Sequence, residues 1–183
     1  MVTSSKQITI TAPRILDRLA PPELHAEIWQ ACMAKRWYFG NQSVTVGTGL
    51  QFWKMDLEDS EPVSRLWERS RAACEQYAGQ PLRVVRQYAN GHTYGLGGGL
   101  HRDDARPGTW TLLYYPMPEW RIEWEGETVW VNTAGEVIAA VRPAPNRAVI
   151  FDSRILHAGR APSRVCGALR VTVAFKLEAA APA

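Results

Sequence analysis

The second half of the chain consists of short apolar runs that alternate with turn-forming residues. Six such runs, rich in β-branched and aromatic residues, occupy residues 82–88, 109–115, 127–131, 136–141, 147–152 and 168–177. Clusters containing glycine, proline, asparagine or aspartate separate most of them. Many short strands joined by turns are typical of an antiparallel sandwich or barrel. We therefore expect a β-rich body.

The first half contains two segments with helical spacing. Residues 21–36 start with proline and place apolar side chains at helical intervals. Residues 60–79 start at Ser60 with Pro62 behind it, and Gly79 is the expected stop. The predicted fold class is therefore α+β and mainly β, with N-terminal helices packed on the β body.

No linker divides the two halves, so residues 1–183 are expected to form a single domain. We expect a helical part over about 1–80, a β core over about 82–177 and a fraying tail over 178–183.

Composition excludes several classes of function. The net charge is only +3 and no block of lysine and arginine occurs, so nothing favours nucleic acid as a partner. Three cysteines without CxxC spacing predict neither a disulfide framework nor a zinc knuckle. No secretory signal or run of about 20 apolar residues is present, so we expect a cytoplasmic protein without a membrane partner.

The segment GGGLHRDDARPG (97–108) gathers three candidate metal ligands. In an extended chain, side chains two positions apart lie on the same face. His101 and Asp103 therefore share one face, whereas Arg102 and Asp104 share the other. A His-x-Asp pair alone is common in polar turns and around buried histidines, so it does not by itself predict a metal.

A second histidine, His157, follows the apolar run at 147–152. Two histidines and one carboxylate on one face of an octahedral metal leave three positions open, which is the arrangement of non-haem Fe(II) oxygenases.

Arg170 begins the last run, RVTVAFK. Alternation places Arg170, Thr172 and Ala174 on one face and Val171, Val173 and Phe175 on the other. The apolar face can pack against the helices, while the arginine points into a barrel. A buried cation needs an anionic partner, and a dicarboxylate ligand would supply one through a bidentate pair.

These motifs together resemble the Fe(II)/2-oxoglutarate-dependent oxygenases, in the prolyl-hydroxylase-like branch. The resemblance covers about residues 82–177 and includes VVRQYANG, TLLYYPMPEW, EGETVWV and RPAPNRAVIFDSRILHAG. It implies a double-stranded β-helix, which is a cupin-like jelly-roll barrel, with iron inside one end.

The resemblance also implies roles for particular residues. Three are assigned to Fe(II): His101, Asp103 and His157. Arg170 and Tyr115 correspond to groups that hold the distal carboxylate of 2-oxoglutarate, and Tyr88 to a group near its metal-bound end. The spacing from His157 to Arg170 is longer than is common in the family, so Arg164 is a rival for the carboxylate.

Candidate substrate contacts are Arg86, His92, Asp104, Arg154 and Trp130. His92 is expected in a loop, Asp104 is also compatible with a turn, and Trp130 with the core. The implied reaction uses Fe(II), 2-oxoglutarate and O₂ to hydroxylate an unactivated C–H bond of a small metabolite, amino acid or biosynthetic intermediate, releasing succinate and CO₂. Asp103 disfavours halogenation, because the related halogenases lack this carboxylate. The alternatives are a protein or peptidyl prolyl-type hydroxylase and a cupin-like metalloprotein that does not use 2-oxoglutarate.

Overall fold

The structure, a computed structural model, describes residues 12–34, 36–43 and 50–180. Within these residues it contains two α-helices, α1 (Pro22–Met33) and α2 (Glu61–Ala78), and a short 3₁₀ turn, η1 (Ile122–Trp124). The strands are β1 (Arg14–Asp17), β2 (Tyr38–Gln42), β3 (Gln51–Asp56), β4 (Leu82–His92), β5 (Thr109–Tyr115), β6 (Thr128–Val131), β7 (Val137–Val141), β8 (Arg147–Asp152), β9 (Leu156–Gly159) and β10 (Arg170–Ala179).

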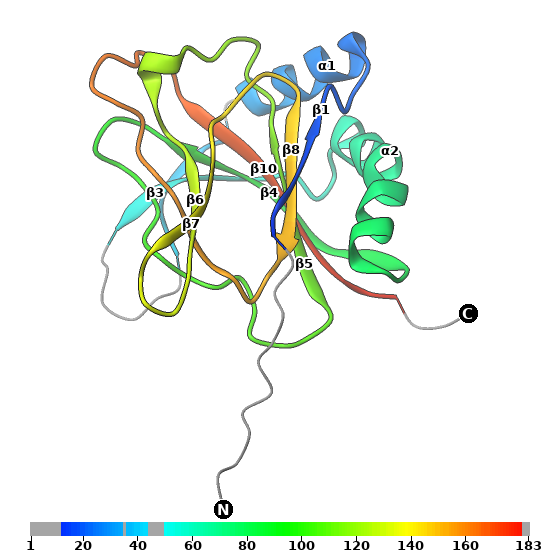
Figure 1. Cartoon of the computed structure of the whole chain (residues 1–183). Coiled ribbons are helices and arrows are strands. Elements are labelled where there is room, and N and C mark those ends of the chain that lie inside the picture. The colour runs from blue at the N-terminus through cyan, green and yellow to red at the C-terminus, as the bar shows by residue number, and fades with distance from the viewer. Residues whose placement is uncertain (1–11, 35, 44–49, 181–183) are drawn as a thin grey trace, which may run out of the picture.

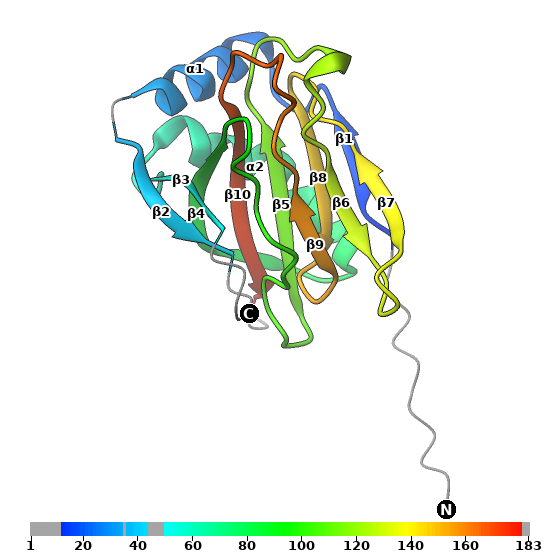
Figure 2. The same ribbon diagram turned by 90° about the vertical axis from the view of Figure 1, so that its left-hand side faces the viewer.

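The strands form two antiparallel sheets that face each other. The large sheet has the order β1-β8-β5-β10-β4-β3-β2, and the small sheet has the order β7-β6-β9. The small sheet lies across one face of the large sheet, and both helices lie against the other (Figure 1). Figure 2 shows the small sheet in front of β5 and β8, with α2 behind the large sheet and α1 along its upper end.

The last strand shows why the layers stack in this order. Val171, Val173 and Phe175 of β10 are fully buried on the helix side of the large sheet. The ring of Phe175 lies 6.3 Å from that of Trp67 in α2, centroid to centroid. The alternate side chains of β10 point between the two sheets, as alternation predicts. This strand therefore contributes to both the core and the interior cavity.

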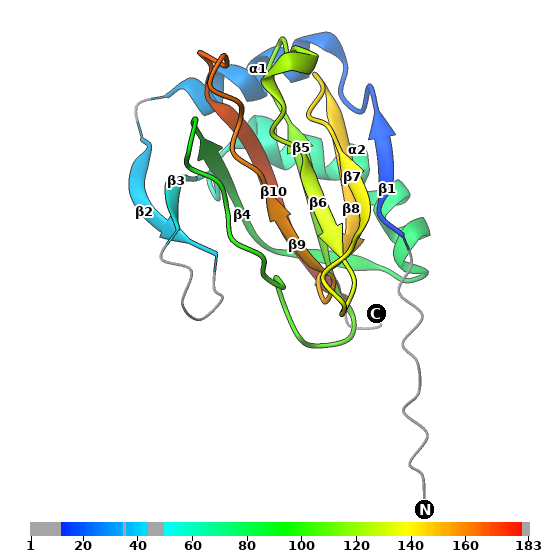
Figure 3. The same ribbon diagram turned by 60° about the vertical axis from the view of Figure 1, so that its left-hand side comes forward.

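The structure adds three strands to the part that was expected to be helical. β2 and β3 pair with each other and extend the large sheet beyond β4, whereas β1 pairs with β8 at the opposite edge. Figure 3 shows β2 and β3 curving forward at one side of the sheet. The two helices lie where they were predicted, and α2 ends at Gly79 in a left-handed conformation with φ of 71°. Large-sheet strands thus come from both halves of the chain.

The C-terminal strand is longer than the sequence indicated. β10 includes Glu178 and Ala179, and the Ala180 N–H donates to Pro81 O at 2.9 Å. Positions 178–180 of the expected fraying tail are therefore hydrogen-bonded to the body. The rest of that tail, 181–183, lies outside the described residues.

Candidate metal and co-substrate site

A cavity opens between the inner face of the large sheet and the small sheet. Its walls include the alternate residues of two neighbouring strands: Arg86, Tyr88, Asn90 and His92 of β4, and Arg170, Thr172, Ala174 and Lys176 of β10. The strand register pairs Arg170 with His92 at one end and Lys176 with Arg86 at the other. The predicted triad residues line the same cavity.

His101 and His157 are brought together by a backbone bridge. The His101 N–H donates to His157 O, and the His157 N–H donates to His101 O, both at 2.9 Å. Residues directly opposite in an antiparallel pair place their side chains on the same face. The two imidazole centroids accordingly lie 4.4 Å apart.

Each imidazole is oriented by a hydrogen bond from its second nitrogen. His101 Nδ1 lies 2.9 Å from Gly99 O, and His157 Nδ1 lies 2.9 Å from Ile155 O. A carbonyl only accepts, so each Nδ1 carries a proton, and each Nε2 faces Asp103. This is the arrangement in which metal-binding histidines are usually held. Burial, which outweighs the opposing charge of Asp103, lowers the pKa of His157 to about 4 and favours the neutral ring.

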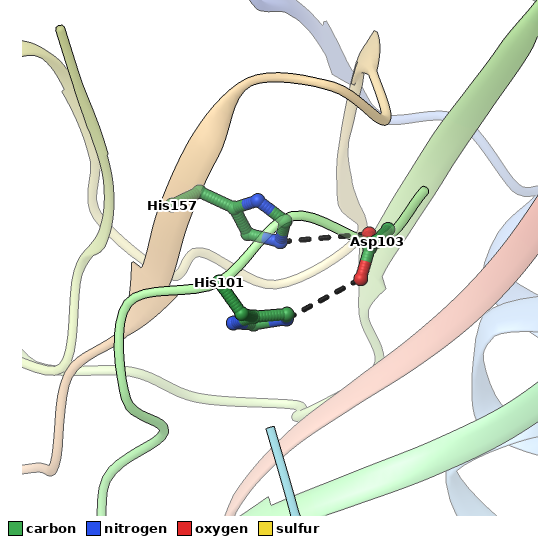
Figure 4. Close-up of side chains that lie close together, drawn as sticks. All are labelled: His101, Asp103 and His157. Atoms are coloured by element: carbon green, nitrogen blue, oxygen red, sulfur yellow. Dashed lines mark ion pairs between the residues drawn. The ribbon is translucent and has the colours of Figure 1, made fainter. Parts of the chain in front are cut away.

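Asp103 faces both histidines. Its Oδ1 lies 3.3 Å from His101 Nε2, and its Oδ2 lies 3.5 Å from His157 Nε2 (Figure 4). The Thr111 hydroxyl donates to Oδ2 at 2.6 Å, and Lys176 Nζ lies 2.5 Å from the same oxygen. Burial alone would raise the pKa of Asp103, but Lys176 and the histidines outweigh it and hold that pKa well below its usual value.

The triad suits a divalent metal. One nitrogen or oxygen from each of the three residues lies within 4.8 Å of the other two. Two imidazoles and one carboxylate on one face are the donor set that non-haem Fe(II) sites use, with further positions left for other ligands.

Arg170 forms a buried cationic end to the cavity. Its side chain donates from Nε to Gly126 O and from Nη2 to Thr128 Oγ1 at 2.9 Å. Its Nη1 lies 3.3 Å from His92 Nδ1, which must accept because a guanidinium only donates. Within the described residues no carboxylate pairs with this side chain, although Arg170 is only 1 % exposed. A buried cation that forms no ion pair among the described residues, and on which Glu127 acts only through its charge, suits a ligand carboxylate.

The two tyrosines lie in different parts of the site. Tyr115 is fully buried, its hydroxyl lies 2.8 Å from Thr128 Oγ1, and Arg170 Cζ lies 5.6 Å from its ring centroid. Tyr88 lines the cavity nearer Lys176, whose Nζ lies 5.7 Å from its ring centroid. The structure therefore places Tyr115 beside Arg170 and Tyr88 beside the group that touches Asp103.

Several candidate residues lie away from the cavity walls. Asp104 accepts from Arg106, both from its side chain and from its backbone N–H. Arg154 pairs with Asp152. Arg164 is exposed in the loop between β9 and β10 and is not among the residues that line the cavity. Trp130 is fully buried against the ring of Phe151, with the centroids 5.2 Å apart.

His92 and Arg86 do line the cavity. His92 ends β4, so it belongs to a strand and not to the expected loop. It is 4 % exposed, and burial followed by the charge of Arg170 lowers its pKa well below the usual value. A neutral His92 can accept from Arg170, so the structure places it beside the expected co-substrate anchor.

Three further cations in the cavity wall were not predicted: Lys54, Arg102 and Lys176. Continuing the alternation of β10 by one more step past Ala174 would have identified Lys176. Alternation across residues 101–104 predicted that Arg102 points away from the triad. In the structure this segment forms only an isolated β-bridge at His101 and is not a regular strand, so alternation does not apply to it. No sequence signal marked Lys54, because β3 was not recognised as a strand.

Comparison with known proteins agrees with this geometry. Residues 85–175 match the family model of the 2OG-Fe(II) oxygenase superfamily. No curated protein sequence matches the chain.

Solved structures show the same fold. The chain is similar to an oxidoreductase of the 2OG-Fe(II) oxygenase family from Burkholderia pseudomallei, at 14% identity and a TM-score of 0.72 over 91% of this chain and 84% of that one. It is also similar to a prolyl hydroxylase from Trichoplax adhaerens in complex with a peptide fragment of hypoxia inducible factor, at 16% identity and a TM-score of 0.67 over 91% and 83% of the two chains. The epimerase SnoN, in complex with Fe³⁺, alpha ketoglutarate and nogalamycin RO, matches at 13% identity and a TM-score of 0.70 over 92% and 79%.

The two facing sheets with helices outside are thus a double-stranded β-helix, as predicted. The chain belongs to the 2OG-Fe(II) oxygenase superfamily. It is an Fe(II)- and 2-oxoglutarate-dependent dioxygenase, so its cofactors are Fe(II), 2-oxoglutarate and O₂. No described helix is both long and apolar enough to cross a bilayer. The expected cytoplasmic location stays a prediction.

Proposed function

We propose that three residues hold Fe(II) in this enzyme: His101, Asp103 and His157. Their nitrogens and carboxylate oxygens converge within 4.8 Å, and both imidazoles are oriented by backbone carbonyls. Arg170 binds the distal carboxylate of 2-oxoglutarate, with Tyr115 beside it and Tyr88 near the metal-bound end. The observation that carries this proposal is a buried guanidinium without a carboxylate partner, in the same cavity as the triad.

When bound together, Fe(II), 2-oxoglutarate and O₂ supply the oxidising chemistry, in which oxidative decarboxylation to succinate and CO₂ accompanies oxidation of the substrate. The chain's own residues position the reactants. Arg170 has five N–H groups, and three of them already point at Gly126, Thr128 and His92. The remaining two, one on each Nη, suit a bidentate carboxylate. Leu113, Thr172 and Ala174 also line the cavity.

The reaction we propose is hydroxylation of an unactivated C–H bond in a small metabolite, an amino acid or a biosynthetic intermediate. A concave cavity between two sheets favours a small molecule. The alternative is a peptidyl prolyl-type substrate, since the similar structures include proteins with either kind of ligand. A cupin-like enzyme that does not use 2-oxoglutarate would leave the buried Arg170 without an anionic ligand.

We also propose that residues 1–183 form one oxygenase domain. Strands β1, β2 and β3 of the first half share a sheet with the strands that carry the site. The first half therefore completes the cavity wall, because β2 and β3 contribute lining residues such as Asn41, Phe52 and Lys54.

A succinate assay tests the proposed reaction. Purified enzyme with Fe(II), 2-oxoglutarate and ascorbate is offered separate pools of free amino acids, small biosynthetic acids and proline-containing peptides. Succinate above the substrate-free background from a small-molecule pool supports the proposal. Stimulation by peptides alone supports the alternative. The activity should be lost in His157→Ala and kept in Asp104→Asn, whose carboxylate is turned away from the triad.

A further inference from the structure

The cavity contains more positive charge than the metal and co-substrate account for. Five described cationic residues line it: Lys54, Arg86, Arg102, Arg170 and Lys176. One described carboxylate residue, Asp103, lines it with them. Lys176 is paired with Asp103, and Arg170 is the proposed anchor of the co-substrate. Three cations remain: Lys54 pairs with the exposed Asp56, whereas Arg86 and Arg102 have no ion pair within the described residues.

Two of these three cations surround the ring of Tyr88 together with Lys176. Arg86 Cζ lies 4.8 Å from the ring centroid, Lys54 Nζ lies 5.4 Å from it, and Lys176 Nζ lies 5.7 Å from it. The three come from three neighbouring strands, β4, β3 and β10. Cations attract the face of an aromatic ring, so Tyr88 helps to hold like charges close together. We define Lys54, Arg86 and Tyr88 as the cationic wall.

The charges of this wall are incompletely neutralised. Lys54 is nearly buried, with 5% of its side chain exposed, and it pairs with Asp56, whose side chain is 57% exposed. Arg86 forms no ion pair within the described residues. Burial and the charge of Arg86 act to lower the pKa of Lys54, but the hydrogen bonds with Asp56 and Tyr38 outweigh them and raise it. Like charges held this close repel each other unless an anion sits between them.

Arg102 adds an exposed guanidinium to the lining of the same cavity. Its Nε donates to Arg154 O at 2.9 Å, which fixes the side chain and leaves the two Nη groups free of any ion pair within the described residues. It is the residue between His101 and Asp103, and it lines the same cavity as the cationic wall. An anion in this part of the cavity would lie near the metal, because Lys176 touches both Tyr88 and Asp103.

We propose that the primary substrate carries an oxyanion, either a carboxylate or a phosphate, that binds to the cationic wall and Arg102. The inference rests on the proposed function, because Arg170 must be occupied by 2-oxoglutarate for these cations to be left over. The oxyanion anchors the substrate while the neighbouring carbon faces the triad. Substrates whose acid is masked as an amide lose this anchor.

Paramagnetic line broadening tests the inference without turnover. Protein saturated with Mn(II) and 2-oxoglutarate is mixed with benzoate, phenyl phosphate or benzamide, and the proton linewidths of each probe are measured. Benzoate and benzamide have nearly the same shape and differ in charge. Mn(II) at the triad broadens only probes that bind close to it, and we expect at least one anion to be broadened about fivefold more than benzamide. The larger effect identifies carboxylate or phosphate as the preferred anion.

Two variants distinguish binding at the cationic wall from a general electrostatic attraction to the protein. Arg86→Gln should weaken binding of the preferred anion about tenfold, as the loss of one charge-assisted hydrogen bond would. Arg83→Gln is the matched control, because Arg83 lies on the same strand but pairs with Glu178 outside the cavity. Equal broadening by the anions and benzamide, or equal effects of the two variants, would overturn the inference.

The signals of 2-oxoglutarate itself provide the remaining control. If they are broadened and the anionic probes behave like benzamide, the proposed co-substrate site stands and the oxyanion inference is wrong. If 2-oxoglutarate is not broadened either, the proposed site is wrong and this inference is overturned with it.

Discussion

Replacing Arg170 with methionine separates binding of the co-substrate from stability of the fold. Methionine keeps much of the length of the side chain and removes its charge and its donors. In the present structure, three of the five N–H groups of Arg170 already have protein partners. The two that remain can donate to both oxygens of one carboxylate.

The size of the effect follows from these two hydrogen bonds. A hydrogen bond to a charged group contributes about 1.5–3 kcal/mol, so two contribute at least about 3 kcal/mol. A loss of about 3 kcal/mol raises the dissociation constant of 2-oxoglutarate roughly a hundredfold. Stability should respond differently, because removing an unpaired buried charge offsets the lost hydrogen bonds to Gly126 and Thr128. We expect the ligand-free protein to change by less than about 1 kcal/mol, or about 2–4 °C in Tm.

Calorimetric titration of the Mn(II)-loaded protein with 2-oxoglutarate measures the affinity, and a thermal melt of the metal-free protein measures the stability. Arg164→Met is the control, since Arg164 is an exposed arginine in the loop that precedes β10 and is absent from the cavity wall. Affinity within threefold of the wild type in Arg170→Met would refute the reasoning. So would an equal loss in Arg164→Met.

Three further predictions concern buried groups. Lys176→Met leaves Asp103 without its cation. We therefore expect the free energy of unfolding of the metal-free protein to fall by about 2 kcal/mol, or about 4–8 °C in Tm, and Mn(II) to stabilise the variant more than the wild type. An unchanged thermal melt would contradict this. Burial raises the pKa values of Cys32 and Cys74 to about 12, so a thiol reagent at pH 8 should label only Cys166 in the folded protein, as counted by mass spectrometry. Fast labelling of all three cysteines would instead show that the core is open. The same burial favours the neutral thiols in the folded protein, so the free energy of unfolding should fall as pH rises above the ordinary thiol pKa of 9.0.

The strands of the second half could be predicted because each carries its own pattern. β5 and β8 have the predicted bounds, since their apolar runs are bounded by turn residues. β2 and β3 have no such pattern. Segments such as YFGNQ (38–42) and QFWKMD (51–56) become strands because β3 pairs with β4, which is distant in the sequence.

Site residues could be predicted where they lie on regular strands, because side-chain alternation applies there. Alternation on β10 indicated that Arg170 points between the sheets, and the structure buries it there. The convergence of His157 on His101 could not be derived from spacing, because it depends on a bridge between segments more than fifty residues apart. Arg102 was misplaced because its segment is irregular, and Lys54 because its strand was not recognised.

The most direct test of the account is an anaerobic titration with Fe(II) and 2-oxoglutarate, followed by visible absorbance. We predict a weak charge-transfer band that appears only when both are present and saturates at one Fe(II) per chain. The band should disappear in Asp103→Asn and in His101→Ala, and it should persist in Asp104→Asn, because Asp104 is paired with Arg106 away from the triad. Persistence of the band in Asp103→Asn and His101→Ala, or its absence from the wild type, would contradict the account.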